Sequence, residues 1–110
     1  MVASVQLFMP MKSHPLAIRL EQYTLKHPAE VLLVHTNVEG EEDQVIIFRG
    51  FSSSLMRSTA YDPDVPVIPE GADIVSIDRL KGPYTPDHPH YLQSGLSVDT
   101  VQPLLENAGV

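Results

Sequence analysis

Residues 30–51, EVLLVHTNVEGEEDQVIIFRGF, decide the fold that the sequence predicts. Two runs rich in Val, Ile and Phe, residues 31–38 and 44–51, flank five polar residues that include Gly40. A short glycine-containing connection between two such runs is typical of a β-hairpin. A third run, ADIVSIDRL at residues 72–80, is suited to the same sheet. The first run begins with four consecutive apolar residues, which need burial on both faces and so predict a strand inside the sheet.

Helical patterns flank this β-rich stretch on both sides. Leu16, Leu20 and Tyr23 recur at the spacing of an amphipathic helix that ends before Pro28. The tail over residues 97–108 has a second apolar stripe and a serine or threonine suited to cap its start. We therefore expect one N-terminal and one C-terminal helix, with the N-terminal helix packed on the sheet.

These elements predict an α+β fold that is mainly β, as a small bent antiparallel sheet or an open SH3-like barrel. Strands without βαβ alternation disfavour a parallel sheet. A chain of 110 residues suits a single domain, 1–110. Within it we expect the following segments: an arm or edge strand at 1–12, a β core at 30–84, a Pro-rich loop at 85–96 and the C-terminal helix at 97–108.

Charge and composition exclude several classes of function. Seven basic and fourteen acidic residues give a net charge of -7, which repels nucleic acid backbones. The absence of cysteine rules out disulfides, thiolate catalysis and cysteine-ligated metals. The N-terminal stretch fails as a signal peptide, and no apolar run approaches the length of a membrane span. We expect a cytoplasmic protein without cofactor or transmembrane segment, and peripheral membrane association stays open.

The long connection at residues 52–71 is the unusual feature of the chain. Connections longer than about 12 to 15 residues are often functional. This one combines apolar anchors with three prolines, so we expect an ordered loop laid across the sheet. Exposed aromatic, Met and Arg side chains are enriched at interfaces. The residues expected to bind a protein partner are Arg49, Phe51, Leu55, Met56, Arg57 and Tyr61.

Two alternative functions rest on other residues. Asp87, His88 and His90, with His35 as a further candidate, could serve a metal-dependent enzyme, although the chain offers no third and fourth ligand near the H-x-H pair. A nucleic-acid-binding small barrel would use the four basic residues Arg49, Arg57, Arg79 and Lys81. His35 lies within a predicted strand, where a neutral imidazole with one satisfied hydrogen bond is the default. No metal site and no catalytic residue is assigned.

The acidic turn at residues 39–43 carries four carboxylates around Gly40. Its spacing lacks the alternating ligands and terminal Glu of a calcium loop. A solvated hairpin tip that discourages edge-to-edge aggregation is the simpler interpretation, and a basic partner surface is the functional alternative.

The pattern from Glu30 to Tyr84 resembles a small domain of unknown function from cyanobacteria and plant plastids. The resemblance covers about half of the chain. It implies a cytoplasmic or stromal protein linked to photosynthetic physiology, and it supplies no catalytic residues. Together with the residue patterns, it leads us to expect a non-catalytic protein-binding module, or an assembly or regulatory factor, of photosynthetic complexes.

Overall fold

A computed structural model describes residues 15–56 and 66–110 of the protein. The predicted arm at 1–12, and with it Arg57 and Tyr61, lies outside the described residues. In chain order, the elements are α1 (Pro15–Lys26), β1 (Glu30–Val38), β2 (Glu41–Phe48), β3 (Phe51–Ser54), β4 (Asp73–Lys81), β5 (Tyr91–Leu96) and α2 (Val98–Asn107).

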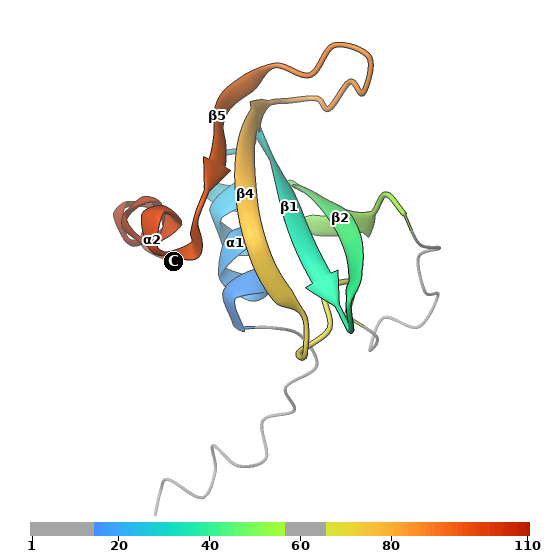
Figure 1. Ribbon diagram of the computed structural model, residues 1–110. Coiled ribbons are helices and arrows are strands. Elements are labelled where there is room, and N and C mark those ends of the chain that lie inside the picture. The colour runs from blue at the N-terminus through green and yellow to red at the C-terminus, as the bar shows by residue number, and fades with distance from the viewer. Residues whose placement is uncertain (1–14, 57–65) are drawn as a thin grey trace, which may run out of the picture.

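The five strands form one antiparallel sheet with the order β3-β2-β1-β4-β5. The sheet is open and curved, with α1 behind it and α2 beside β5 (Figure 1). The predicted mainly β fold with an N-terminal and a C-terminal helix is confirmed, and the sheet does not close into a barrel. β1 is the central strand, as its apolar run predicts, and residues 73–81 join the same sheet on its other side.

The first hairpin has a shorter turn than the sequence suggested. Its loop is the pair Glu39 and Gly40, with φ values of 53° and 85°, and β2 already begins at Glu41. Positive φ at both central residues is typical of a type I′ turn, whose twist matches that of the two strands. Asn37 Oδ1 accepts a hydrogen bond from the Gly40 amide at 2.9 Å. Three of the acidic residues assigned to the turn therefore belong to a strand.

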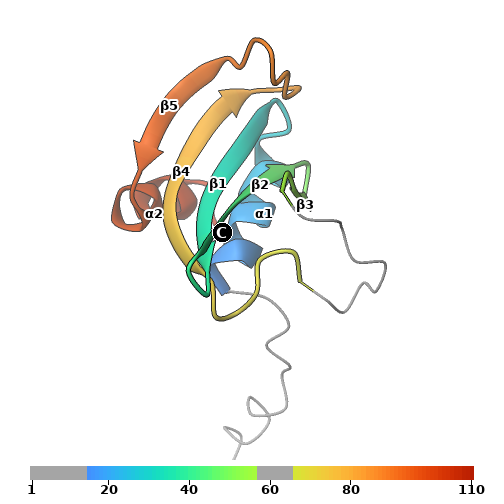
Figure 2. The ribbon, with the colours of Figure 1, turned by 45° about the vertical axis from the view of Figure 1, so that its right-hand side comes forward.

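A second tight turn follows directly and was missed. Arg49 and Gly50 have φ values of 50° and 86°, so the chain reverses there and Phe51–Ser54 form β3 against β2. The prediction that one strand runs on to residue 51 is wrong, and so is the prediction that the long connection starts at residue 52. Gly50 serves a turn rather than a bulge. β3 is one edge of the sheet, and Figure 2 shows it at the right side of the molecule.

The predicted Pro-rich loop at 85–96 is shorter than expected. Its last six residues, Tyr91–Leu96, form β5 beside β4. The pairing with β4 shifts register twice, and Gly95 has a φ of 69°. This strand escaped prediction because it lacks alternation: Tyr91 to Gly95 are all exposed.

The C-terminal helix is confirmed, with Ser97 as its cap. The Ser97 side chain accepts a hydrogen bond from the Thr100 amide, which satisfies a helix N-terminal donor. Of the two candidate caps, Ser97 is therefore the one used, and the helix continues past Pro103, which lies inside it.

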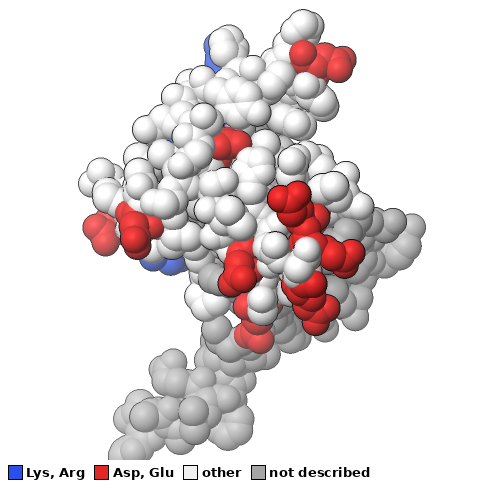
Figure 3. All heavy atoms as spheres, viewed as in Figure 1, with Lys and Arg blue, Asp and Glu red and all other residues white. Residues whose placement is uncertain are grey.

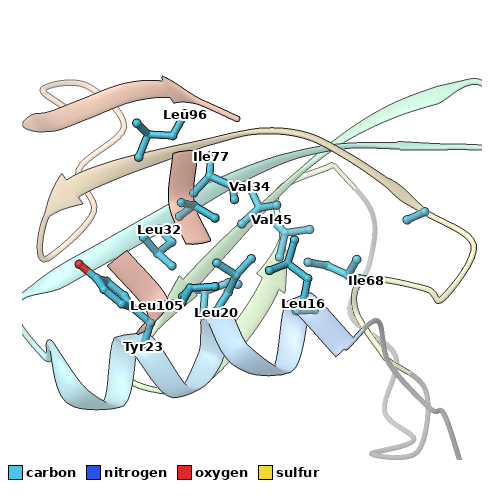
Figure 4. Close-up of a cluster of buried hydrophobic side chains, with 14 residues drawn as sticks. Leu16, Leu20, Tyr23, Leu32, Val34, Val45, Ile68, Ile77, Leu96 and Leu105 are labelled. Atoms are coloured by element: carbon cyan, nitrogen blue, oxygen red, sulfur yellow. The ribbon is translucent and has the colours of Figure 1, made fainter. Parts of the chain in front are cut away.

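The main core lies between the helices and one face of the sheet. Figure 4 shows Leu16, Leu20 and Tyr23 of α1 directed towards Leu32, Val34 and Val45 of the sheet. Leu105 of α2 belongs to the same cluster, as does Ile68 from the connection before β4. Both helices thus cover the same face, which we call the covered face. The opposite face, which we call the open face, has no described helix on it.

Candidate functional site: the open face of the sheet

Strand register places a row of apolar side chains across the open face. In an antiparallel pair, directly opposite residues point to the same side of the sheet. Phe51 lies opposite Phe48, Phe48 opposite Val31, and Val31 opposite Leu80. These four residues, which we call the apolar row, come from four adjacent strands. The next residues on this face, Ile46 and Leu33, also lie opposite each other, and they extend the apolar surface towards the middle of the sheet.

Burial within the apolar row falls from its centre to its edge. Val31, Leu33 and Leu80 form a small buried cluster, with Ile46, Phe48 and Tyr84 packed partly buried against it. Phe51, on edge strand β3, leaves 79% of its surface exposed. Such an aromatic side chain at the end of an apolar row contributes little to folding and offers contact area to another molecule.

The structure brings the described members of the predicted partner-binding set to the β2–β3 hairpin. The Arg49 guanidinium lies over the Phe48 ring, with Cζ 4.9 Å from its centroid, and donates a weak hydrogen bond to the Pro28 carbonyl. Leu55 and Met56 continue from the end of β3, and both are exposed. Arg49 and Phe51 lie at the turn, whereas Leu55, whose amide donates to the Gln44 carbonyl at 2.8 Å, and Met56 lie at the other end of β3, so the four residues are spread along this edge of the sheet.

Acidic side chains border the open face at one end. Figure 3 shows this face largely free of charge, with red carboxylates gathered at the lower right, where β1 turns into β2. Val38, Asp43 and Met56 line a hollow of about 380 Å³ near this turn, but the register puts Val38 and Asp43 on the covered face. Of the β2 carboxylates there, Glu42, which lies opposite Asn37, is the one on the open face. This acidic border lies at the far end of β1 from the apolar row, so the two together favour an extended ligand that is apolar at one end and basic at the other.

Asp78 forms a polar network in the middle of the open face that the sequence did not indicate. Its Oδ2 lies 2.8 Å from His35 Nε2, and its Oδ1 accepts a hydrogen bond from the Gly95 amide at 2.8 Å. The carboxylate is nearly buried, while the His35 side chain is 31% exposed. We call these three residues the Asp78 network. It ties β1, β4 and β5 together, and it gives His35 the carboxylate partner that sequence spacing alone did not reveal.

Glu30 forms a second polar network, on the covered face. Arg79 donates two hydrogen bonds to its carboxylate, from Nε to Oε1 and from Nη2 to Oε2, each 3.0 Å long. The Tyr23 hydroxyl donates to Oε1 at 2.9 Å, and Arg79 also donates to Gln93. The His27 ring stacks on Tyr23, and its Nδ1 lies 3.8 Å from Glu30 Oε2. We call Tyr23, Glu30 and Arg79 the Glu30 network.

The Glu30 network shifts the ionisation of its members. Burial raises the pKa of Tyr23 to about 12, helped by its hydrogen bond to Glu30 and by the charge of that carboxylate. Burial also opposes ionisation of Glu30, but hydrogen bonds from Arg79 and Tyr23 and the Arg79 charge outweigh it and lower the Glu30 pKa. The Arg79 pKa is raised, mainly by its hydrogen bond to Glu30. The pair is therefore ionised at neutral pH and serves the structure.

The residues of the metal hypothesis do not assemble into a metal centre. Asp87, His88 and His90 lie in the connection between β4 and β5, whereas His35 pairs with Asp78 in the middle of the sheet. Among residues 15–56 and 66–110, no group of three or more His, Asp or Glu side chains could hold an ion. The described residues therefore lend that alternative no support.

The basic residues of the nucleic-acid hypothesis are similarly divided. Arg79 belongs to the Glu30 network on the covered face. Arg49 stacks on Phe48 at the β2–β3 turn, and Lys81 is exposed at the end of β4. Two ion-paired or stacked guanidinium groups on different parts of the sheet do not form a phosphate-binding patch. Arg57 lies outside the described residues.

The fold and the site define a small α+β domain with one face of its sheet covered by helices and the other open. Residues 17–105 match the model of the family described as Domain of unknown function (DUF7734), and the chain belongs to that family. No curated protein and no solved structure matches the chain. Neither of the two described helices has the length and apolar character required to cross a membrane.

Proposed function

We propose that this protein is a non-catalytic protein-binding module whose partner docks on the apolar row at the β2–β3 hairpin. The exposure of Phe51 carries the proposal, because a phenylalanine 79% exposed beside partly buried Phe48 and Ile46 leaves apolar surface without a role in folding. Leu55, Met56 and Arg49 extend this surface along the edge of the sheet.

The partner segment that fits this surface is apolar and carries basic side chains. The apolar row would receive its apolar residues, and the acidic border at the β1–β2 turn would attract its Lys or Arg side chains. The net charge of -7 also attracts a positively charged partner at longer range. The resemblance to cyanobacterial and plastid domains supports a cytoplasmic or stromal partner connected with photosynthetic complexes, so we include such an assembly or regulatory role in the proposal.

Site-specific photocrosslinking tests this proposal. A photoreactive phenylalanine analogue at position 51 should yield one dominant protein adduct in an extract of the source cells. The matched control carries the analogue at position 92, because Leu92 is half exposed on β5, the opposite edge of the sheet. The adduct should form several-fold more from position 51, and its yield should fall as salt screens the acidic border. Equal labelling from both positions, or none from either, would contradict docking at the hairpin.

A further inference from the structure

Within the described part of the chain, the Asp78 network leaves one nitrogen of His35 without a hydrogen-bond partner. Both carboxylate oxygens of Asp78 are engaged, one by the Gly95 amide and one by His35 Nε2. A backbone amide can only donate, and an ionised carboxylate can only accept, so His35 donates from Nε2. In a neutral imidazole the other ring nitrogen then has no hydrogen. In its neutral form, His35 therefore presents Nδ1 as a hydrogen-bond acceptor.

The backbone of β5 is adapted to this arrangement. The β4–β5 register shifts between Ile77 and Arg79, at the position of Asp78, and Gly95 adopts a left-handed φ of 69°. This irregularity turns the Gly95 amide away from the ladder and towards the carboxylate. A buried carboxylate and a distorted strand thus fix the orientation of one imidazole, in the way that a carboxylate orients a histidine in a catalytic triad.

The residues that surround the His35 ring are uncharged apart from Asp78, and the side chain is partly exposed. Its neighbours across the sheet are Gln44 on β2 and Ser76 on β4, and Leu33 lies two residues before it on the same face. Asp78 is the titratable group in contact with it. Among the described residues, Nδ1 has no hydrogen-bond partner, although the ring is 31% exposed. An oriented acceptor therefore stands beside the apolar surface, next to a negative charge.

We infer that His35 selects the docked segment by accepting, through Nδ1, a hydrogen bond from a Lys or Arg side chain of the partner. This inference rests on the proposed function and names the residue that determines its specificity. A neutral imidazole bonded to a carboxylate carries a net negative charge, which favours a cationic donor over a neutral one. The ring is partly buried beside Leu33, which shields that bond from water and strengthens it.

Selection from a random peptide library displayed on phage tests the inference. The baits are the full-length wild type and the variants His35→Leu, Asp78→Asn and Phe51→Glu, with His88→Leu as a matched control on an exposed histidine outside the sheet. The wild type and the control should enrich apolar peptides that contain Lys or Arg. A synthetic copy of the leading peptide should bind His35→Leu about ten- to a hundredfold more weakly, the loss expected for a hydrogen bond to a charged group.

Asp78→Asn reverses the polarity of the site without changing its size. The oxygen of the introduced side-chain amide must accept from the Gly95 amide, so its NH₂ group faces His35 Nε2. The neutral ring then carries its hydrogen on Nδ1 and becomes a donor at that nitrogen. Imidazole ¹⁵N NMR should show the Nε2–H tautomer in the wild type and the Nδ1–H tautomer in this variant. The variant should accordingly lose its preference for Lys and Arg and enrich peptides with acceptor groups.

The outcomes separate the two proposals. If His35→Leu binds the selected peptide as tightly as the wild type, the role of His35 is wrong while docking on the apolar row stands. The same conclusion follows if Asp78→Asn still prefers basic peptides. If the wild type enriches apolar peptides with Lys or Arg no more strongly than Phe51→Glu does, the proposed docking surface is wrong. The inference about His35 is then wrong as well. Thermal unfolding of each variant establishes that it is folded before it is used.

Discussion

Among the mostly buried carboxylates of the sheet, Glu30 at the start of β1 and Asp78 in β4 are satisfied in different ways. In the Glu30 network, both carboxylate oxygens are bonded within the protein: Arg79 and Tyr23 donate to them on the covered face. In the Asp78 network, the carboxylate is equally well satisfied, but its partner His35 keeps one nitrogen free of any described partner on the open face. The Glu30 network therefore serves folding, whereas the Asp78 network retains a ring nitrogen that can bind another molecule.

The largest loss of stability is expected when the arginine of the Glu30 network is removed. Arg79→Leu leaves the Glu30 carboxylate with the Tyr23 hydroxyl and the more distant His27, so the free energy of unfolding should fall by about 3 kcal/mol. Urea unfolding measures this change. Lys81→Leu is the control, since Lys81 is exposed and its loss should cost less than about 0.5 kcal/mol. Equal effects of the two substitutions would show that the Glu30 network does not stabilise the fold.

A smaller effect follows from the ionisation of Tyr23. Its pKa of about 12 in the folded protein lies above the value of 10.0 for an unperturbed tyrosine, so the unfolded state loses the proton first. The Tyr23 contribution to stability is complete well below pH 10 and declines as the pH rises towards 12. At pH 11 about 1.4 kcal/mol should already be lost. Because Tyr23→Phe cannot titrate, the stability difference between wild type and variant should narrow by that amount between pH 8 and pH 11. A constant difference would mean that burial and the Glu30 carboxylate do not raise the Tyr23 pKa.

The smallest effect on stability is expected at Phe51, the exposed end of the apolar row. Phe51→Ser should change the free energy of unfolding by less than about 0.5 kcal/mol, because the side chain is mostly exposed. Phe48→Ala, one strand away in the apolar row, should cost about 2 kcal/mol, since Phe48 packs against the buried cluster of Val31, Leu33 and Leu80. Denaturant melts of both variants test the contrast. A large loss from Phe51→Ser would assign Phe51 to folding and remove the main support for docking there.

Local chemistry determined which parts of the fold could be predicted from the sequence. Three predictions depended on a few neighbouring residues each, and all three are confirmed. They are the buried strand β1 from its consecutive apolar residues, the helix α1 from its apolar stripe, and the cap at Ser97. β3 was missed because Arg49–Gly50 is a two-residue turn signal that a following run of serines obscured. β5 was missed because an exposed edge strand needs no alternation of polar and apolar residues.

The candidate site depended on contacts that no local pattern encodes. Phe51, Leu55 and Met56 could be selected by residue type, but their place beside the apolar row follows from the register between β2 and β3. His35 and Asp78 are 43 residues apart in the chain, and a β-bulge with Gly95 completes their network. Pairing register is set by the whole sheet, since a shift of one residue would move each side chain to the opposite face.

The β2–β3 turn is held from behind by α1. Its Gly50 amide donates to the Thr24 hydroxyl at 2.8 Å, and a Cβ at Gly50 would lie 2.9 Å from Leu25 Cδ2, so the helix and the turn are in close contact. The hairpin that presents Phe51 is thereby fixed before any partner arrives. Association at this edge does not have to order a loosely held loop, so little conformational entropy is lost there on binding. A modest contact area could then suffice for a specific complex, one that forms at close to its encounter rate and dissociates without rearrangement of the fold.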